Sequence, residues 1–449
     1  MSEINNAGLT QDPVAKTLIK LAIPMVVGLL SVVVFNITDT FFIGKLGTKE
    51  LAALSFTFPV VLIIATFGVG LGAGTSAVIS REIGKGEYKK ASILSIDALF
   101  LTLAIACIFI VAGYSTFNFV FKLLGADSAT MPLIKQYMMV WYSAVPFVFL
   151  PMVGNSIIRS GGNTKIPSLI MLIAAISNAV LDPFLIFGIG PFPRLGIQGA
   201  AIATCIARGL ALIASLWYLR YKQKLLYFQK HSFKKILDSW KPILYIGLPT
   251  AGTSIIIPIS VGIITRMLSS YGHEAVAGFG VGSRIDFFAL IIVSALGVVL
   301  GPFIGQNLGA KKIGRILYGV HFSIWFSLLW GLLMFAVILI GAEKIAFAFN
   351  RNARVTTQAV AYLRIIPISY GLQGVILLIG SALNVLHKPM HALAIRLIHI
   401  LVLYIPLAFI GKHYFGVKGI FLGVAVSYII GGILAWKVVY RMLPKEEQA

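Results

Sequence analysis

Twelve long apolar runs dominate this chain and limit what it can fold into. A stretch of about 20 apolar residues matches the roughly 30 Å hydrocarbon core of a bilayer, so each run predicts a membrane-spanning helix. The runs occupy residues 18–44, 51–79, 92–121, 132–158, 166–189, 196–219, 243–270, 275–303, 315–341, 357–386, 391–411 and 417–438. They use more than half of the 449 residues and leave no room for a sizeable domain outside the membrane. The sequence predicts an all-α polytopic membrane protein.

The composition excludes a water-soluble protein. Hydrophobic residues make up 58% of the chain and charged residues only 12%, whereas an average soluble domain has about 25% charged residues. In a soluble protein the net charge of +22 would indicate nucleic-acid binding. Here the basic residues lie in the short loops between apolar runs, so we expect no nucleic-acid partner. The two cysteines both fall within apolar runs, and no disulfide framework is indicated.

The basic residues also predict the orientation in the membrane. An even number of spans puts both termini on one side. The loops and termini of that side hold 22 of the 37 Lys and Arg residues, against about 11 on the opposite side. The positive-inside rule therefore favours cytoplasmic termini. The polar N-terminus carries Glu3 and Asp12, unlike a cleaved signal peptide. We expect a multi-pass protein of the cell (inner) membrane whose first span is retained.

The two halves of the chain are copies of one unit. Five pairs are separated by 225 positions: Pro24 and Pro249, Gly47 and Gly272, Ala52 and Ala277, Gly72 and Gly297, and Gly84 and Gly309. Residues 196–199 match residues 416–419 at a spacing of 220. Six spans in each copy enter the membrane in the same sense, which predicts a pseudo-twofold axis along the membrane normal and a site between the halves. We predict six-helix lobes at 1–220 and 242–449, joined by a cytoplasmic linker at 221–241.

Two acids lie clearly inside predicted spans, which is costly unless the residue has a function. Asp39 is on the first span and Asp182 is on the fifth. Asn36 precedes Asp39 by three positions and Asn178 precedes Asp182 by four, so each Asn shares a helix face with its Asp. One interpretation is a set of polar clamps between helices. The other is a cation-coupling site, since two carboxylates exceed what a neutral clamp requires.

The physics of buried carboxylates supports the coupling interpretation. Two nearby carboxylates in an apolar cavity are poorly solvated and repel each other, so at least one is expected to hold a proton. Such a group can load a proton outside and release it inside. Oxygen atoms of Asp, Asn and Thr can equally hold Na⁺, a hard cation. The sequence leaves H⁺ and Na⁺ open as the coupling ion and indicates no other cofactor.

Prolines lie next to these acids. Pro183 directly follows Asp182, and Pro24 lies about four turns before Asp39, with Gly28 one turn further on. A proline inside a helix removes a backbone hydrogen bond and loosens that turn. Each site is therefore either a static kink or a hinge through which protonation of Asp39 bends the first helix.

The second half lacks the same acids. The position 225 after Asp39 is Ile264, and the region matching Asp182 has no acid. Coupling is therefore expected in the N-terminal half alone. Arg284 and Asp286 are two positions apart on the eighth span and need not pair. Gln373, on the tenth span, is either a cavity group or a contact between helices.

The chain resembles the multidrug and toxic compound extrusion (MATE) family along its whole length. The resemblance is carried by residues 21–25 (LAIPM), 36–44 (NITDTFFIG), 46–47 (LG), 51–53 (LAA), 159–167 (RSGGNTKIP), 178–183 (NAVLDP) and 196–204 (GIQGAAIAT). The last two stretches are similar to the DinF-like subgroup. The resemblance implies an antiporter that exports organic, often cationic, compounds by alternating access, driven by inward H⁺ or Na⁺.

The resemblance also implies roles for particular residues. Asp39, Asn178 and Asp182 correspond to coupling residues of DinF-like members, with Thr204 as a fourth, and the same four oxygen-bearing residues are the candidate Na⁺ ligands. Pro24 and Gly28 match a first-helix bend. The candidate residues of the substrate cavity are Tyr137, Arg284 and Gln373. NorM-like members carry acids on the seventh and tenth helices. Here those regions offer Thr253 and Ser254, then Tyr370 and Gln373, which argues against a sodium site in the C-terminal half.

Other functions fit the residues less well. Lipid-linked oligosaccharide flippases share the broader architecture, but they are expected to line a large cavity with cations, and the clearest interior charges here are acids. A membrane-embedded enzyme needs a nucleophile and base or a metal site at membrane depth, and the seven histidines show no metal-ligand spacing. We expect a monomeric transporter of small organic molecules in the bilayer, and no enzyme.

Overall fold

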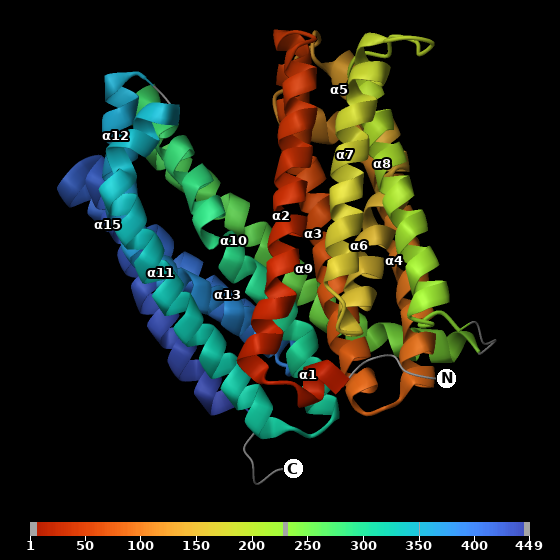
Figure 1. Cartoon of the computed structure of the whole chain (residues 1–449). Helices are drawn as coiled ribbons and strands as arrows, with labels where there is room; N and C mark the ends of the chain where they lie inside the picture. Colours follow the sequence, from red (N-terminus) through yellow and green to blue (C-terminus); the bar gives the residue numbers. More distant parts are fainter. Residues whose placement is uncertain (1–6, 228–231, 350, 444–449) are drawn as a thin grey trace. The chain divides into compact units, whose positions relative to one another are not determined.

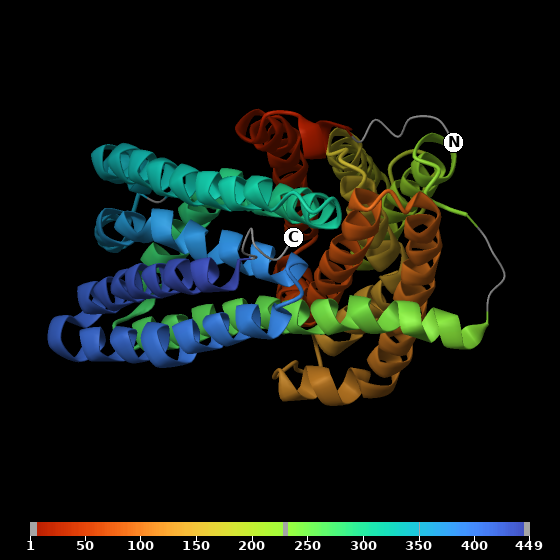
Figure 2. The ribbon, with the colours of Figure 1, turned by 90° about the horizontal axis from the view of Figure 1, so that it is seen from below.

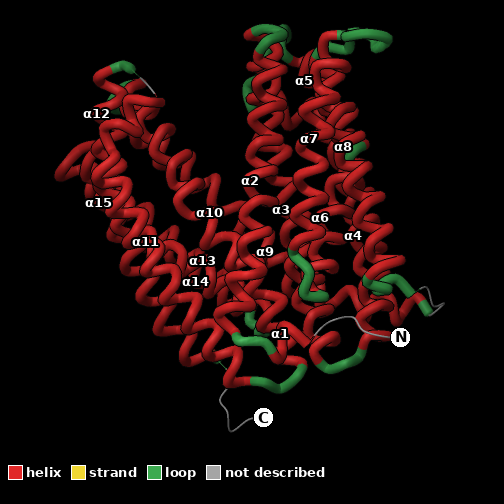
Figure 3. The backbone as a smooth tube through the Cα atoms, viewed as in Figure 1, coloured by secondary structure: helices red, strands yellow, loops and turns green. Residues whose placement is uncertain are grey.

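The computed structural model describes residues 7–227, 232–349 and 351–443, and these residues form helices joined by short loops (Figure 3). In chain order the helices are α1 (Ala7–Gln11), α2 (Val14–Gly44), α3 (Thr48–Gly84), α4 (Tyr88–Leu123), α5 (Met131–Ser143), α6 (Val145–Ser160), α7 (Lys165–Phe187), α8 (Ile197–Trp217), η1 (Tyr218–Lys222), α9 (Phe233–Ser269), α10 (His273–Gly309), α11 (Ile313–Phe349), α12 (Ala353–Ile365), η2 (Ile366–Ser369), α13 (Tyr370–Val385), α14 (Pro389–Ile398), η3 (His399–Tyr404) and α15 (Ile405–Met442). All twelve predicted spans therefore fall on helices.

The fourth span of each repeat is broken at the same place. In the first repeat α5 and α6 meet at a 45° bend. In the second, the 3₁₀ turn η2 separates α12 from α13. Pro146 lies just past the first break and Pro367 lies within η2, and each lacks the N–H that would continue the ladder of the preceding helix. Proline chemistry thus explains why these two spans are not continuous helices.

The last two predicted spans form a helical hairpin. The segment Pro389–Met442 is helical for 54 residues, but Gly416 has a non-helical backbone with φ of 59°. A Cβ on Gly411 would lie 2.0 Å from the carbonyl oxygen of Gly419, so the helices on either side of Gly416 fold back on each other. Gly196, the repeat counterpart, has φ of 56° at the start of α8. Glycine takes such positive φ values at little cost, which explains its presence at both turns.

The chain divides into two compact units. Unit 1 contains Met1–Gly8 and Ile23–Ala251, and unit 2 contains Leu9–Ala22 and Gly252–Ala449. The helix α2, red in Figure 1, therefore begins in unit 2 and continues in unit 1, and α9 begins in unit 1 and continues in unit 2. The predicted lobes, 1–220 and 242–449, differ from the units mainly in these first helical segments. Part of the predicted linker, 228–231, lies outside the described residues.

Glycines allow close helix packing within unit 1. A Cβ on Gly70 would lie 2.3 Å from the carbonyl oxygen of Gly247, and one on Gly74 would lie 2.3 Å from that of Ile243. The helix α3 thus approaches the first part of α9 backbone to backbone, which explains why small residues recur there. In unit 2, α13 packs against both α11 and α15 (Figure 2).

Candidate functional site

The coupling residues predicted from sequence lie on four helices of unit 1. Asp39 is on α2, Asn178 and Asp182 are on α7, Thr204 is on α8, and Tyr137 is on α5. The side chains are buried, with exposed fractions of 8% for Asp39 and 0% for both Asn178 and Asp182. Each of these helices belongs to a membrane-spanning segment. Burial at that depth means that the ionised carboxylates lack the solvation of water.

Hydrogen bonding and charge connect these groups. The Asn178 side-chain nitrogen donates to the Asp182 carboxylate over 3.1 Å, so the pair shares a helix face as its spacing predicts. Asp39 and Asp182 are close enough to interact electrostatically. The Tyr137 hydroxyl lies within electrostatic reach of both acids. The structure therefore brings together residues from three segments far apart in sequence.

Four buried oxygens of this group accept no hydrogen bond from the described residues. They are Asp39 Oδ1, Asn178 Oδ1, Asp182 Oδ2 and Thr204 Oγ1. A buried polar atom without a partner is costly and calls for a proton, a water molecule or a cation. Carboxylate, amide and hydroxyl oxygens also suit a hard cation such as Na⁺. The oxygen atoms therefore fit both coupling ions that the sequence leaves open.

Three other predicted residues lie outside this group. Asn36 is exposed, and its backbone carbonyl accepts a hydrogen bond from the Thr40 hydroxyl. Arg284 is exposed on α10 and Gln373 is half-buried on α13, both in unit 2. The Gln373 side-chain oxygen is buried and has no hydrogen-bond partner among the described residues.

The predicted hinge residues lie inside helices. Pro24 is within α2 and Pro183 is within α7. A Cβ on Gly28 would lie 3.1 Å from both Ser168 Cα and Met171 Sδ, so Gly28 lets α2 approach α7 closely. Gly28 thus has a packing role, whether or not α2 bends beside it.

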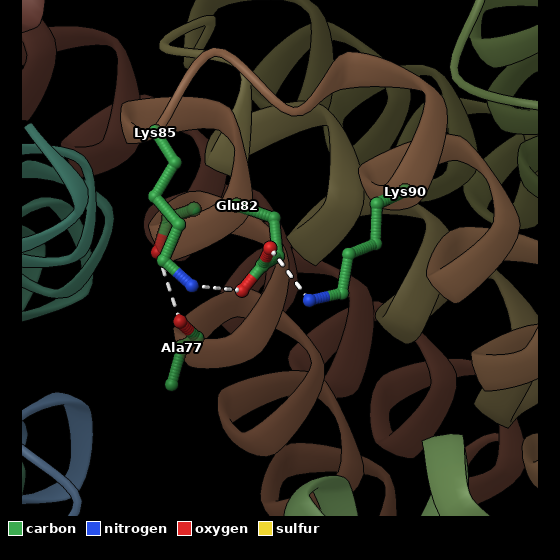
Figure 4. Close-up of polar contacts among 5 residues, drawn as sticks. Ala77, Glu82, Lys85 and Lys90 are labelled. Carbon is green, nitrogen blue, oxygen red and sulfur yellow. Dashed lines mark hydrogen bonds and ion pairs between the residues drawn. The ribbon is translucent and has the colours of Figure 1, made fainter.

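The sequence analysis did not single out two further buried acids, Glu82 and Asp97. Glu82, near the end of α3, forms ion pairs with Lys85 at 2.7 Å and Lys90 at 3.0 Å (Figure 4). Asp97, in α4, is 1% exposed, and its backbone carbonyl accepts a hydrogen bond from the Trp240 indole. Glu82 is matched by two cations, whereas Asp39 and Asp182 form no ion pair with any described residue. Glu82 therefore has a structural role.

The loop acid Asp127 has hydrogen-bond partners for its carboxylate. Asp127 lies between α4 and α5, where its carboxylate accepts hydrogen bonds from the hydroxyl and the amide of Thr130. These hydrogen bonds hold the pKa of Asp127 below its usual range. Its role is to fix the turn before α5.

A half-buried arginine in unit 1 was also not singled out by the sequence. Arg208 on α8 lies over the ring of Phe35, with 4.7 Å from the guanidinium carbon to the ring centroid. Its Nε atom is buried without a hydrogen-bond partner, and no acid in the described part of the chain pairs with it. An arginine at membrane depth that has no protein anion nearby is a candidate for contact with an anionic ligand.

Comparison with known proteins shows to which family this chain belongs. The MatE family model matches residues 24–184 and 249–410, one copy in each repeat. The chain belongs to the MATE family of transporters. A MATE transporter of Vibrio cholerae, VcmN, solved in the bent form, is 32% identical with a TM-score of 0.92, covering 99% of each chain. The MATE chain is thus an all-helical, multi-pass membrane transporter of small organic molecules, and not an enzyme.

Two relatives of known name cover nearly the full length. An FAD transporter of Shewanella oneidensis is 39% identical over 435 residues, 97% of this chain and 96% of its own. The multidrug export protein MepA of Staphylococcus aureus is 26% identical over 436 residues, 96% of this chain and 95% of its own.

Proposed function

We propose that this MATE protein is an antiporter that exports a flavin dinucleotide, with FAD as the first substrate to test. The observation that carries this proposal is the 39% identity, over nearly the whole of both chains, to a relative named as an FAD transporter. Three relatives, one named as a multidrug export protein and two as probable multidrug resistance proteins, are 24–28% identical.

The chemistry of unit 1 is compatible with such a substrate. A flavin dinucleotide has an anionic pyrophosphate and flat aromatic rings. The Arg208 guanidinium has no acidic partner among the described residues and can form paired hydrogen bonds with a phosphate group. The Phe35 ring beneath it holds the guanidinium plane in place. We assign Arg208 as the residue that binds the substrate's phosphates.

Export against a gradient requires a coupling ion, and the Asp39–Asp182 group is the proposed site for it. Binding of one H⁺ or Na⁺ lowers the negative charge of the two poorly solvated carboxylates by one, and release on the other side restores it. An ion shifts a conformational equilibrium only by its different affinity for the two states. In our mechanism α2 bends at Pro24 when Asp39 is neutralised, as the resemblance to the DinF-like subgroup implies. Both termini are proposed to lie in the cytoplasm. A related structure described as a bent form supports such a bend.

The test is export from proteoliposomes containing the purified full-length protein. A pH gradient and a sodium gradient are imposed separately, and FAD efflux is measured for each. We expect one gradient to drive FAD efflux, and Arg208→Ala to reduce that efflux at least about 10-fold, which corresponds to about 1.4 kcal/mol. Arg208→Lys is the matched control for charge, since lysine keeps the charge but loses the paired geometry. Absence of FAD efflux under either gradient would contradict the proposal.

The second candidate is export of organic cations, which the multidrug relatives favour. The same proteoliposomes loaded with a cationic dye distinguish the two. Removal of the Arg208 charge should impair FAD export but not dye export, because a cation gains nothing from a guanidinium. Dye efflux with no FAD efflux would favour the multidrug candidate.

A further inference from the structure

Unit 2 contains a carboxylate that the sequence left without a role. Asp286 lies well inside α10, a helix long and apolar enough to span a membrane. One of its carboxylate oxygens accepts a hydrogen bond from the Tyr362 hydroxyl, and the other accepts one from the Tyr370 hydroxyl. Tyr362 is 4% exposed and Tyr370 is 0% exposed. Both oxygens of the carboxylate therefore have buried, neutral donors.

No cation balances this charge within the described residues. Asp286 forms no ion pair there, although Glu82 and Glu343 do. Arg284, two positions earlier, is exposed and on another face of α10. The two tyrosines belong to a hydrophobic cluster that includes Ile285 and Phe421. Asp286 itself is half-buried, so its ionised carboxylate is stabilised mainly by the two hydrogen bonds, and gaining a proton relieves the partial desolvation.

The internal repeat relates this group to the coupling group of unit 1. Tyr362 lies 225 positions after Tyr137. Tyr137 lies within electrostatic reach of Asp39 and Asp182, and Tyr362 donates to Asp286. In both repeats the tyrosine is on the first segment of the broken fourth span. Each repeat therefore places a buried tyrosine at the same position within electrostatic reach of a carboxylate, although the acids come from different helices.

In the described part of the chain, the other titratable groups near Asp286 are mainly tyrosines. Tyr404 on η3 and Tyr428 on α15 lie within its electrostatic reach. Arg396 on α14 interacts with these two tyrosines. Asp286 is thus the acidic member of a cluster whose nearest groups are neutral tyrosine hydroxyls.

We propose that Asp286, Tyr362 and Tyr370 form a proton-binding site in unit 2, additional to the coupling site of unit 1, which takes up and releases one proton in each transport cycle. This inference rests on the proposed function of ion-driven export. A tyrosine hydroxyl can donate to the ionised carboxylate and can accept from the protonated carboxyl, so the proton enters and leaves without displacing heavy atoms. Two hydroxyl donors aimed at the carboxylate fit a proton better than a metal cation, which would repel the donor hydrogens.

The first test measures protonation directly, without transport. Infrared difference spectra of the full-length protein in liposomes are recorded as the pH is changed. We expect Asp286→Asn to remove one carboxyl band that wild-type protein gains on acidification. Tyr362→Phe and Tyr370→Phe should shift the pH midpoint of that band, whereas Tyr404→Phe, which removes no hydrogen bond to Asp286, should not. Identical difference spectra for wild type and Asp286→Asn would overturn the proposal.

The second test counts protons in transport. The proton-to-substrate ratio in proteoliposomes should fall by one in Asp286→Asn, and an unchanged ratio would overturn the role in the cycle. If Asp286→Asn fails to fold, Tyr370→Phe replaces it, and an unshifted band midpoint contradicts the site. Failure of the Asp39–Asp182 mechanism is detected separately, because Asp39→Asn would then keep wild-type uphill export while the Asp286 band remains.

Discussion

The buried acids of this chain differ in whether a basic side chain neutralises them. We assign a structural role to the neutralised acid Glu82 and a functional role to Asp39 and Asp182, which no basic side chain among the described residues neutralises. Glu82 pairs with Lys85 and Lys90, so its charge is neutralised at the end of α3. Asp39 and Asp182 have unpartnered carboxylate oxygens instead. An uncompensated charge at membrane depth costs several kcal/mol, about 2.5–3.5 on insertion scales. Such a charged residue is therefore expected to have a function.

Replacing Asp39 with Asn tests directly whether Asp39 binds the coupling ion. Asp39→Asn keeps the size and hydrogen-bonding capacity of the side chain but removes the group that binds the proton or cation. We expect driven export to fall to the leak of empty liposomes while the protein remains folded and inserted. The measurement is uphill efflux at matched protein density, with size-exclusion profiles as the control for folding. Wild-type efflux would show that Asp39 does not carry the coupling ion.

Asp182→Asn should cause a comparable loss, because Asp39 and Asp182 interact electrostatically and are proposed to titrate together. Residues that act as one unit have non-additive effects. The double variant should therefore be no worse than the more damaged single variant. The measurement compares the efflux rates of the two single variants and the double variant. A loss in the double variant equal to the product of the two single losses would indicate two independent sites.

At the scale of helices, the hydrophobic pattern predicted the features that depend on local sequence. The placement of the predicted spans on helices and the shared face of Asn178 and Asp182 are confirmed. The contacts of Asp286 with Tyr362 and Tyr370 were not predicted, since 76 and 84 positions separate the partners. Helix periodicity fixes which residues share a face, but not which face of another helix they meet.

The helix α2 tests the hinge interpretation of Pro24. Pro24→Ala restores one backbone hydrogen bond and favours the straight helix. Coupled efflux should fall, while substrate affinity in one state stays largely unchanged. Binding affinity and gradient-driven efflux are measured on the same purified variant. Unchanged efflux would make Pro24 a static kink, and loss of both binding and expression would make it a structural residue.

The close approach of α3 to α9 predicts a stability effect. A Cβ on Gly74 would lie 2.3 Å from the Ile243 carbonyl oxygen, so Gly74→Ala must push two backbones apart. Overpacking of this kind costs typically about 1–3 kcal/mol. Gly262→Ala on α9 is the matched control, because no atom lies within 4 Å of its added Cβ. Thermal unfolding in detergent should show a lower midpoint for Gly74→Ala alone, and equal midpoints would show that the helices adjust freely.

For the molecule as a whole, the repeat is symmetric in sequence but not in the contacts it makes. Asn307 and Arg315 lie 225 positions after Glu82 and Lys90. Each pair joins the end of one helix to the start of the next, over 3.0 Å in both cases. The second pair consists of the Asn307 amide and the Arg315 guanidinium. Only the Nε–H of Arg315 is used in this pair, so its other N–H groups can donate elsewhere. Arg315 uses them on the carbonyl oxygens of Leu9 and Asp12, which belong to unit 2.

This contact should hold the N-terminal segment to unit 2. Asn307 also donates to Leu9, and Lys312 donates to Thr10, so Arg315 is the centre of a network of carbonyl contacts. Arg315→Gln removes the charge-assisted hydrogen bonds, which are worth about 1.5–3 kcal/mol each. Local opening follows the free energy of such contacts, so amide exchange in residues 9–22 should accelerate at least about 10-fold, which corresponds to about 1.4 kcal/mol. Lys90→Gln, the change at the repeat counterpart, should leave that exchange unchanged. Equal exchange in wild type and Arg315→Gln would show that packing of α2, and not this network, retains the segment.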